Sequence, residues 1–204
     1  HRFIRRIFSP EDLGERLKPF VFLDYIHGAI PEGGGFGYHP HSGIATVTFQ
    51  QSIDIDYEDT TGLRDIIKAR GVEYVQAGGG LWHKASLKGR QRDATGFQLW
   101  LSLPPELEEA PARSVYVPPE AVAQKDNVRV LLGEYEGARS PIVAPYPINY
   151  FWVQLAEGQT FSFLPPADHE ICWAFAFGGR VTSSGLSTSE ELLIFDREEG
   201  ALSF

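Results

Sequence analysis

Two histidines, His39 and His41, stand two residues apart, directly after a glycine-rich stretch and directly before a segment of alternating residues. In an extended chain, side chains at positions i and i+2 point to the same side of the strand. Both imidazoles can therefore reach one point, and imidazole is a ligand that suits iron, copper, nickel and zinc. The pair predicts a transition-metal site.

A third histidine, His83, follows the glycine run 78–80. Glycines let the backbone turn tightly before His83 enters a strand, and its same-face neighbours Leu81 and Ala85 are apolar. Three histidines from two strands can bind a metal on one face and leave positions open for substrate or water. The alternative is a metal-free site in which histidines next to Gly and Pro are solvated or merely pack.

The sequence patterns predict many short strands, which must position these histidines. The 21 glycines and 14 prolines favour a β-sandwich or barrel. Short helices are expected at residues 10–17, opened by Ser9, and at 118–124. The expected strands are 44–49, 52–57, 71–76, 97–103, 127–132, 151–155, 160–164, 171–177 and 191–195.

If the histidines point inward, Ala45, Val47 and Phe49 follow on the same face and form an apolar barrel wall. A proline-rich, acidic stretch at 104–119 reads as a linker between two β-rich halves. We therefore expect two barrels, of which only the first carries the chemistry of a metal site.

The net charge of -9 disfavours direct contact with nucleic acid, and no apolar stretch is long enough to span a membrane. The single Cys172 lies in an apolar run, which predicts a buried, inert thiol and fits a reducing, cytoplasmic location. The chain begins with His1 and holds no methionine. We therefore expect a longer gene product, either with trimmed ends or with methionines missing from the sequence.

Four blocks in sequence order together resemble the pirin family and cover about residues 19–104. The resemblance implies a bicupin, an all-β fold of two cupin-type β-barrels packed face to face. Residues 1–110 would form an N-terminal cupin barrel with the histidines, and residues 111–204 a degenerate C-terminal cupin barrel. The blocks are residues 20–25, 39–43 with 46–48, 77–83 and 96–101.

The resemblance also implies the metal ligands His39, His41 and His83, with Fe(II) as the first expectation and Zn, Ni or Cu as alternatives. The family's fourth ligand, a glutamate two residues after the third histidine, is Ala85 here. The glutamate of the cupin motif that follows the histidine pair is likewise Ala45. The remaining site is neutral. Gln98 is a candidate for a fourth ligand or for a residue that contacts one of the ligands.

We expect one of two functions. No residue in the sequence is a convincing general base, which weakens the case for an enzyme. The first is an oxygenase of the quercetin 2,3-dioxygenase type, whose metal binds the deprotonated hydroxyl of a flat aromatic substrate before O2 adds to the ring. The second is a non-catalytic pirin-like regulatory or ligand-binding protein that acts through a protein partner. The expected wall residues of an aromatic pocket are Tyr38, Phe49, Trp82 and Phe97.

Overall fold

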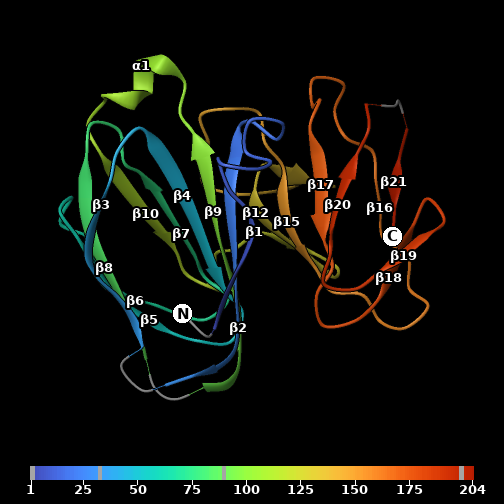
Figure 1. Cartoon of the computed structure of the whole chain (residues 1–204), viewed down its shortest axis with the longest axis horizontal. Coiled ribbons are helices and arrows are strands. Elements are labelled where there is room, and N and C mark those ends of the chain that lie inside the picture. The colour runs from blue at the N-terminus through green and yellow to red at the C-terminus, as the bar shows by residue number, and fades with distance from the viewer. Residues whose placement is uncertain (1–2, 32–33, 89–90, 198–199) are drawn as a thin grey trace.

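The computed structural model describes residues 3–31, 34–88, 91–197 and 200–204, and nearly all of its regular structure is β (Figure 1). The described part of the chain holds one short helix, α1 (Pro105–Glu108). The expected all-β class is confirmed. In the described residues, no helix is long and apolar enough to cross a membrane.

The first half consists of two antiparallel sheets that face each other, on the left of Figure 1. The six-stranded sheet has the order β1 (Ile4–Phe8), β2 (Phe20–Ile30), β9 (Gln91–Ser102), β4 (Ile44–Gln50), β7 (Val72–Gln76) and β10 (Arg113–Val117). The four-stranded sheet has the order β3 (Gly35–His41), β8 (Leu81–Leu87), β5 (Ile55–Asp59) and β6 (Arg64–Ile67). No ladder joins the two sheets among the described strands, so this barrel is not closed.

The chain crosses from the four-stranded to the six-stranded sheet at Gly43, between β3 and β4. Gly43 has a φ of 67°, in the left-handed region that glycine adopts readily, and its N–H donates to the carbonyl of Gly78 at 2.7 Å. This bend changes which residues face the histidines, because β3 and β4 do not form one continuous strand.

The expectation that Ala45, Val47 and Phe49 share the face of the histidines is therefore wrong. These three side chains belong to the core on the opposite face of the sheet. Thr48 and Gln50 line the cavity that His83 also lines. The wall opposite the histidines is thus partly polar.

The second half forms smaller antiparallel sheets, on the right of Figure 1. A three-stranded sheet has the order β11 (Gln124–Lys125), β12 (Val128–Leu132) and β15 (Tyr150–Val153). The two-stranded pairs are β13 (Glu134–Tyr135) with β14 (Ala138–Arg139), β16 (Ser162–Phe163) with β21 (Leu202–Ser203), β17 (Cys172–Phe175) with β20 (Leu192–Phe195), and β18 (Val181–Ser183) with β19 (Leu186–Thr188). The stretch 104–119 holds α1 and β10, and β10 pairs with β7 of the first half.

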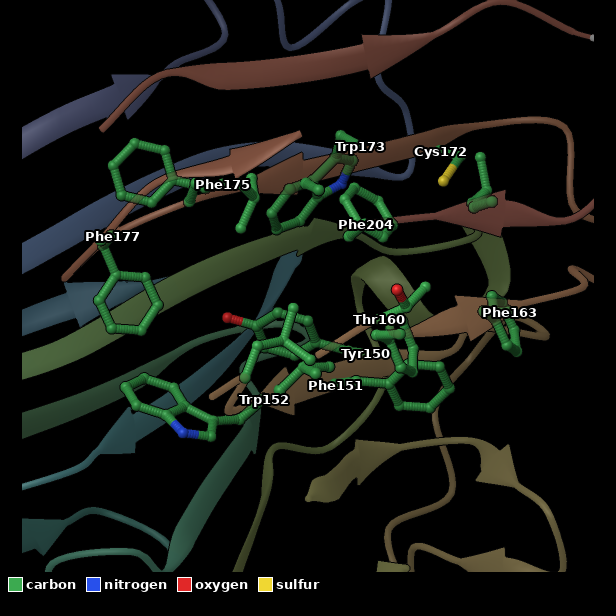
Figure 2. A pocket seen from close by; sticks show the side chains of 18 of the residues that line it. Tyr150, Phe151, Trp152, Thr160, Phe163, Cys172, Trp173, Phe175, Phe177 and Phe204 are labelled. Atoms are coloured by element: carbon green, nitrogen blue, oxygen red, sulfur yellow. The ribbon is translucent and has the colours of Figure 1, made fainter. Parts of the chain in front are cut away.

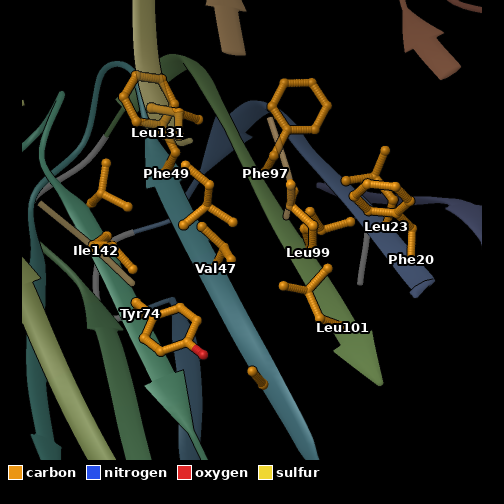
Figure 3. Packing of buried hydrophobic residues seen from close by; sticks show 14 of the residues in the cluster. Phe20, Leu23, Val47, Phe49, Tyr74, Phe97, Leu99, Leu101, Leu131 and Ile142 are labelled. Atoms are coloured by element: carbon orange, nitrogen blue, oxygen red, sulfur yellow. The ribbon is translucent and has the colours of Figure 1, made fainter. Parts of the chain in front are cut away.

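The two halves share one hydrophobic core, which Figure 3 shows from close by. Val47, Leu99 and Leu101 point from the six-stranded sheet toward the second half and are essentially unexposed. Leu131 and Ile142 of the second half pack into the same cluster. This burial holds the six-stranded sheet between the second half and the histidine-bearing sheet.

Neither expected helix is present, since residues 10–17 form turns and residues 118–124 form turns and the start of β11. In the first segment the Asp12 carboxylate accepts the backbone N–H groups of Ser9 and Leu13. Gly14 lies so close to the preceding turn that an added Cβ would sit 2.7 Å from the Cα of Pro10. These local bonds replace a helical ladder.

Candidate metal site

His39 and His83 lie directly opposite each other on the neighbouring strands β3 and β8. Their Nε2 atoms are 2.9 Å apart. The Nδ1 atom of His39 lies 2.8 Å from the carbonyl oxygen of Gly37, which selects the tautomer with the proton on Nδ1. The Nε2 lone pair of His39 therefore points toward His83 and accepts the Nε2–H of that ring, and a metal that replaced this proton would be bound by both nitrogens.

His41 completes the cluster from the same face of β3. Its ring centroid is 5.0 Å from that of His39 and 4.9 Å from that of His83. One nitrogen of each residue lies within 4.8 Å of the other two. Nitrogens bound to one metal at about 2.1 Å lie roughly 3.0 to 3.4 Å apart, so small side-chain rotations suffice to bring all three onto one ion. The predicted convergence of three histidines is confirmed.

The burial of two of these rings also fits metal ligands. His83 is 2% exposed and His41 is 9% exposed. His41 Nε2 and His83 Nδ1 are buried and have no hydrogen-bond partner among the described residues. Burial, followed by the charge of the neighbouring His39, lowers the pKa of His41 to about 4. Burial also lowers the pKa of His83 to about 3, and the charges of His39 and His41 contribute to this shift. Both imidazoles are therefore neutral at pH 7, the form that binds a metal.

The glycine run before β8 brings His83 to β3. Gly78 has a φ of 52°, and an added Cβ would lie 2.0 Å from the carbonyl oxygen of Ala110. The backbone passes this close because no side chain intervenes. Because Gly78 also binds Gly43, the turns that lead into β4 and β8 are fixed to each other.

A cavity of about 30 Å³ lies between the two sheets beside His83. Gln98, whose face was ambiguous in the sequence, points into this cavity from β9. Thr48 and Glu73 point into it from β4 and β7, and Ala85 from β8. The structure thus places Gln98 and His83 around one space and adds Glu73, which sequence reasoning missed.

The four expected aromatic wall residues do not line this cavity. Tyr38 and Trp82 alternate with His39 and His83 along β3 and β8, so they point outward and are 49% and 52% exposed. Phe49 and Phe97 alternate with Thr48 and Gln98, so they lie on the far face of the six-stranded sheet.

A different aromatic group stands next to the histidines. The ring of Trp100 lies 5.1 Å from that of His41, edge to face, and stacks on Phe22 at 4.0 Å. The guanidinium of Arg6 covers Phe22 at 3.8 Å. The Trp100 indole N–H donates to Gln98 Oε1 at 3.3 Å. Gln98 and Trp100 alternate in the sequence with Leu99 and Leu101, and this alternation was the signal that could have found the wall.

Asp59 and Tyr57 support His83 from β5. The Tyr57 ring contacts His83 edge to face at 5.6 Å, and its hydroxyl donates to Asp59 at 2.9 Å. Asp59 also accepts hydrogen bonds from Thr61 and Ser114. Burial alone would raise the pKa of Asp59, but these hydrogen bonds lower it overall. Asp59 is therefore an ionised carboxylate that already has its partners.

We expect Ala85→Glu to tighten zinc binding by about tenfold, or roughly 1.4 kcal/mol. Ala85 follows His83 by two residues on β8 and lines the same cavity, so a carboxylate there reaches the site and adds negative charge. The matched control is Ser86→Glu, because Ser86 is exposed on the other face of β8. Zinc titration of both variants measures the effect, and unchanged or weaker affinity would mean that residue 85 does not reach the metal.

A second, larger cavity of about 800 Å³ opens in the other half of the protein. Figure 2 shows its aromatic lining, in which Tyr150 and Trp152 face Trp173 and Phe175. Phe97 also lines it, reaching across from the six-stranded sheet. In the described residues, three histidines, cysteines or carboxylates come close enough to hold a metal only at His39, His41 and His83, so this cavity has no comparable cluster.

Cys172 borders the larger cavity, and burial raises the pKa of its thiol to about 11 from 9.0. At pH 8 the reactive thiolate fraction then falls roughly a hundredfold below that of an unperturbed thiol. We expect Cys172 to react with a disulfide reagent about a hundred times more slowly in the native protein than in denaturant. Equal rates in both conditions would contradict a raised pKa of this half-buried thiol.

Comparisons with known proteins point to one family. A sequence profile described as Pirin matches residues 2–101. A pirin-like protein from Caulobacter vibrioides is 31% identical over 189 residues, which cover 88% of this chain and 67% of that relative.

Solved structures agree with this match. A quercetin 2,3-dioxygenase from Acinetobacter baumannii superimposes with a TM-score of 0.86 and 26% identity, over 98% of this chain and 75% of that one. The bacterial pirin YhhW from Escherichia coli, solved with nickel(II), has a TM-score of 0.77 over the whole chain and 86% of its own, and its 19% identity shows the fold alone. The expected cupin-type fold is confirmed by these matches.

Proposed function

Because the chain belongs to the pirin family, we propose that it is a metal-dependent oxygenase of the quercetin 2,3-dioxygenase type that acts on a flat aromatic substrate. We propose Fe(II) as the metal, since three imidazoles with open positions suit this ion. The observation that carries the proposal is the convergence of His39, His41 and His83 beside an aromatic wall.

The roles of the residues follow from their positions. His39, His41 and His83 would hold the metal, and a bound metal would supply a Lewis acid for an ionised substrate hydroxyl and a centre for O2 chemistry. Trp100, backed by Phe22, offers an apolar surface beside His41 for an aromatic ring. The buried face around Tyr57 and His83 keeps bulk water from the inner side of the site.

The test uses protein reconstituted separately with Fe(II), Zn, Ni and Cu. We expect one metal ion per chain, and O2 uptake with quercetin in at least the Fe(II) form. His41→Ala should lose both, whereas His27→Ala, which changes a histidine outside the cluster, should lose neither. Failure of the wild-type protein to bind any of the four metals would overturn the proposal.

A non-catalytic regulatory or ligand-binding role is the second candidate. The observation that favours it is Ala85, because the strand that carries His83 offers no carboxylate beside that ligand. Stoichiometric metal without O2 uptake, in protein whose His41→Ala variant loses the metal, would favour this role over the oxygenase.

A further inference from the structure

A row of polar side chains crosses the inner face of the six-stranded sheet. Asp24 of β2 is paired with Gln98 of β9, Gln98 with Thr48 of β4, and Thr48 with Glu73 of β7. All four residues line the 30 Å³ cavity that His83 also lines. A sheet face that met only a hydrophobic core would carry apolar residues at these positions.

Three members of the row have partners. Asp24 accepts a hydrogen bond from the Arg6 guanidinium at 2.5 Å, and the Gln98 amide donates to the Thr48 hydroxyl at 3.5 Å. Glu73 is only partly satisfied: it is 2% exposed, the side chains of Thr48 and Tyr57 stabilise its charge, and its Oε1 atom is buried without a hydrogen-bond partner among the described residues. A buried carboxylate without full pairing is costly, so its presence suggests a role other than stability.

The surroundings of Glu73 show what charge it faces. Across the cavity lie His83, Tyr57 and Ala85, none of which is negatively charged at pH 7. The two other buried carboxylates near the site already have partners. Asp24 forms an ion pair with Arg6, and Asp59 accepts hydrogen bonds from Tyr57 and Thr61. Within the described cavity lining, Glu73 is therefore the carboxylate whose charge is not already compensated.

We propose that Glu73 is the charge-compensating residue of the metal site, supplying from the opposite sheet the negative charge that three neutral imidazoles do not provide to a divalent cation. The inference rests on the proposed metal site. Glu73 need not be a ligand, because the interaction between opposite charges is strong across a buried, poorly solvated space. Such outer residues commonly change metal affinity by roughly 10- to 100-fold.

The first test is a zinc titration of the whole chain against a competing chelator at pH 7.5. We expect Glu73→Gln, which keeps the shape and removes the charge, to weaken zinc binding roughly 10- to 100-fold. Glu73→Asp keeps the charge and should lose less. The matched control is Glu58→Gln, because Glu58 lies on β5 next to Tyr57 but pairs with Lys84 on the outer face.

The second readout is the urea midpoint of the metal-free protein at pH 8. We expect Glu73→Gln to raise this midpoint, because it removes an unpaired buried charge, while the same substitution weakens zinc binding. If Glu73 had a purely structural role, Glu73→Gln would lower both the urea midpoint and the zinc affinity. A lower midpoint, or zinc affinity equal to that of the wild type, would overturn the proposal.

The outcomes also separate this inference from the proposed function. If the wild type binds zinc, His83→Ala abolishes binding and Glu73→Gln has no effect, the metal site stands and the role of Glu73 is wrong. If the wild type binds none of zinc, Fe(II), Ni and Cu, both are wrong.

Discussion

Zinc binding should weaken by about 3 kcal/mol, or more than a hundredfold, when His83 is replaced by alanine. His83 is the most buried of the three imidazoles, and its Nε2 atom lies 2.9 Å from that of His39. Its removal leaves two ligands from a single strand, which cannot bind a metal facially. Equilibrium titration against a competing chelator measures the loss, and His41→Ala should behave in the same way.

The control for this prediction is His27→Ala. His27 stacks on Tyr25 at 4.8 Å and is not part of the three-histidine cluster, so its loss removes an imidazole without touching the site. Circular dichroism of each variant establishes that it is folded. A folded His83→Ala protein that binds zinc as tightly as His27→Ala would show that His83 is not a ligand.

The metal-free protein should lose about 3 kcal/mol of stability between pH 4.5 and pH 7 because of Glu73 alone. Burial raises the pKa of this carboxyl to about 7 from 4.5, while the side chains of Thr48 and Tyr57 lower it by less. The folded protein therefore holds the proton at pH values where the unfolded chain has released it. The stabilisation is complete below pH 4.5 and is lost as the pH rises to about 7.

The difference between the wild type and Glu73→Gln isolates this effect, because other groups titrate in both proteins. The groups that face Glu73 are Tyr57 and Asp59 from β5, His83 from β8, Asp24 from β2 and Tyr116 from β10. Urea unfolding at several pH values gives the free energy of unfolding of each protein. Parallel pH profiles for the two proteins would contradict a raised pKa at Glu73.

The metal ligands could be predicted from the sequence because local spacing decides them. His39 and His41 share a face of any extended strand, and the glycines before His83 allow the tight turn that starts β8. The resemblance of four sequence blocks to the pirin family added the fold. These features depend on short segments whose geometry the residue types strongly restrict.

The opposite wall could not be predicted, because it depends on how the two sheets are joined. The bend at Gly43 changes which face each residue of β4 takes, so Phe49 lies away from the histidines and Thr48 lines the cavity beside His83. Gln98 and Trp100 share a face by alternation, but which face meets the site depends on the pairing of β9 with β2 and β4. Glu73 carries no local signal of its role, since polar and apolar residues share both faces of its short strand.

The most direct test of the three-histidine site is anomalous X-ray scattering from crystals of the protein soaked separately with Fe(II), Ni and Zn, recorded on both sides of each absorption edge. We expect one strong peak within bonding distance, about 2.0 to 2.2 Å, of a nitrogen atom from each of His39, His41 and His83. A peak elsewhere in the chain, or no peak in a crystal whose three imidazoles are ordered, would contradict the metal site.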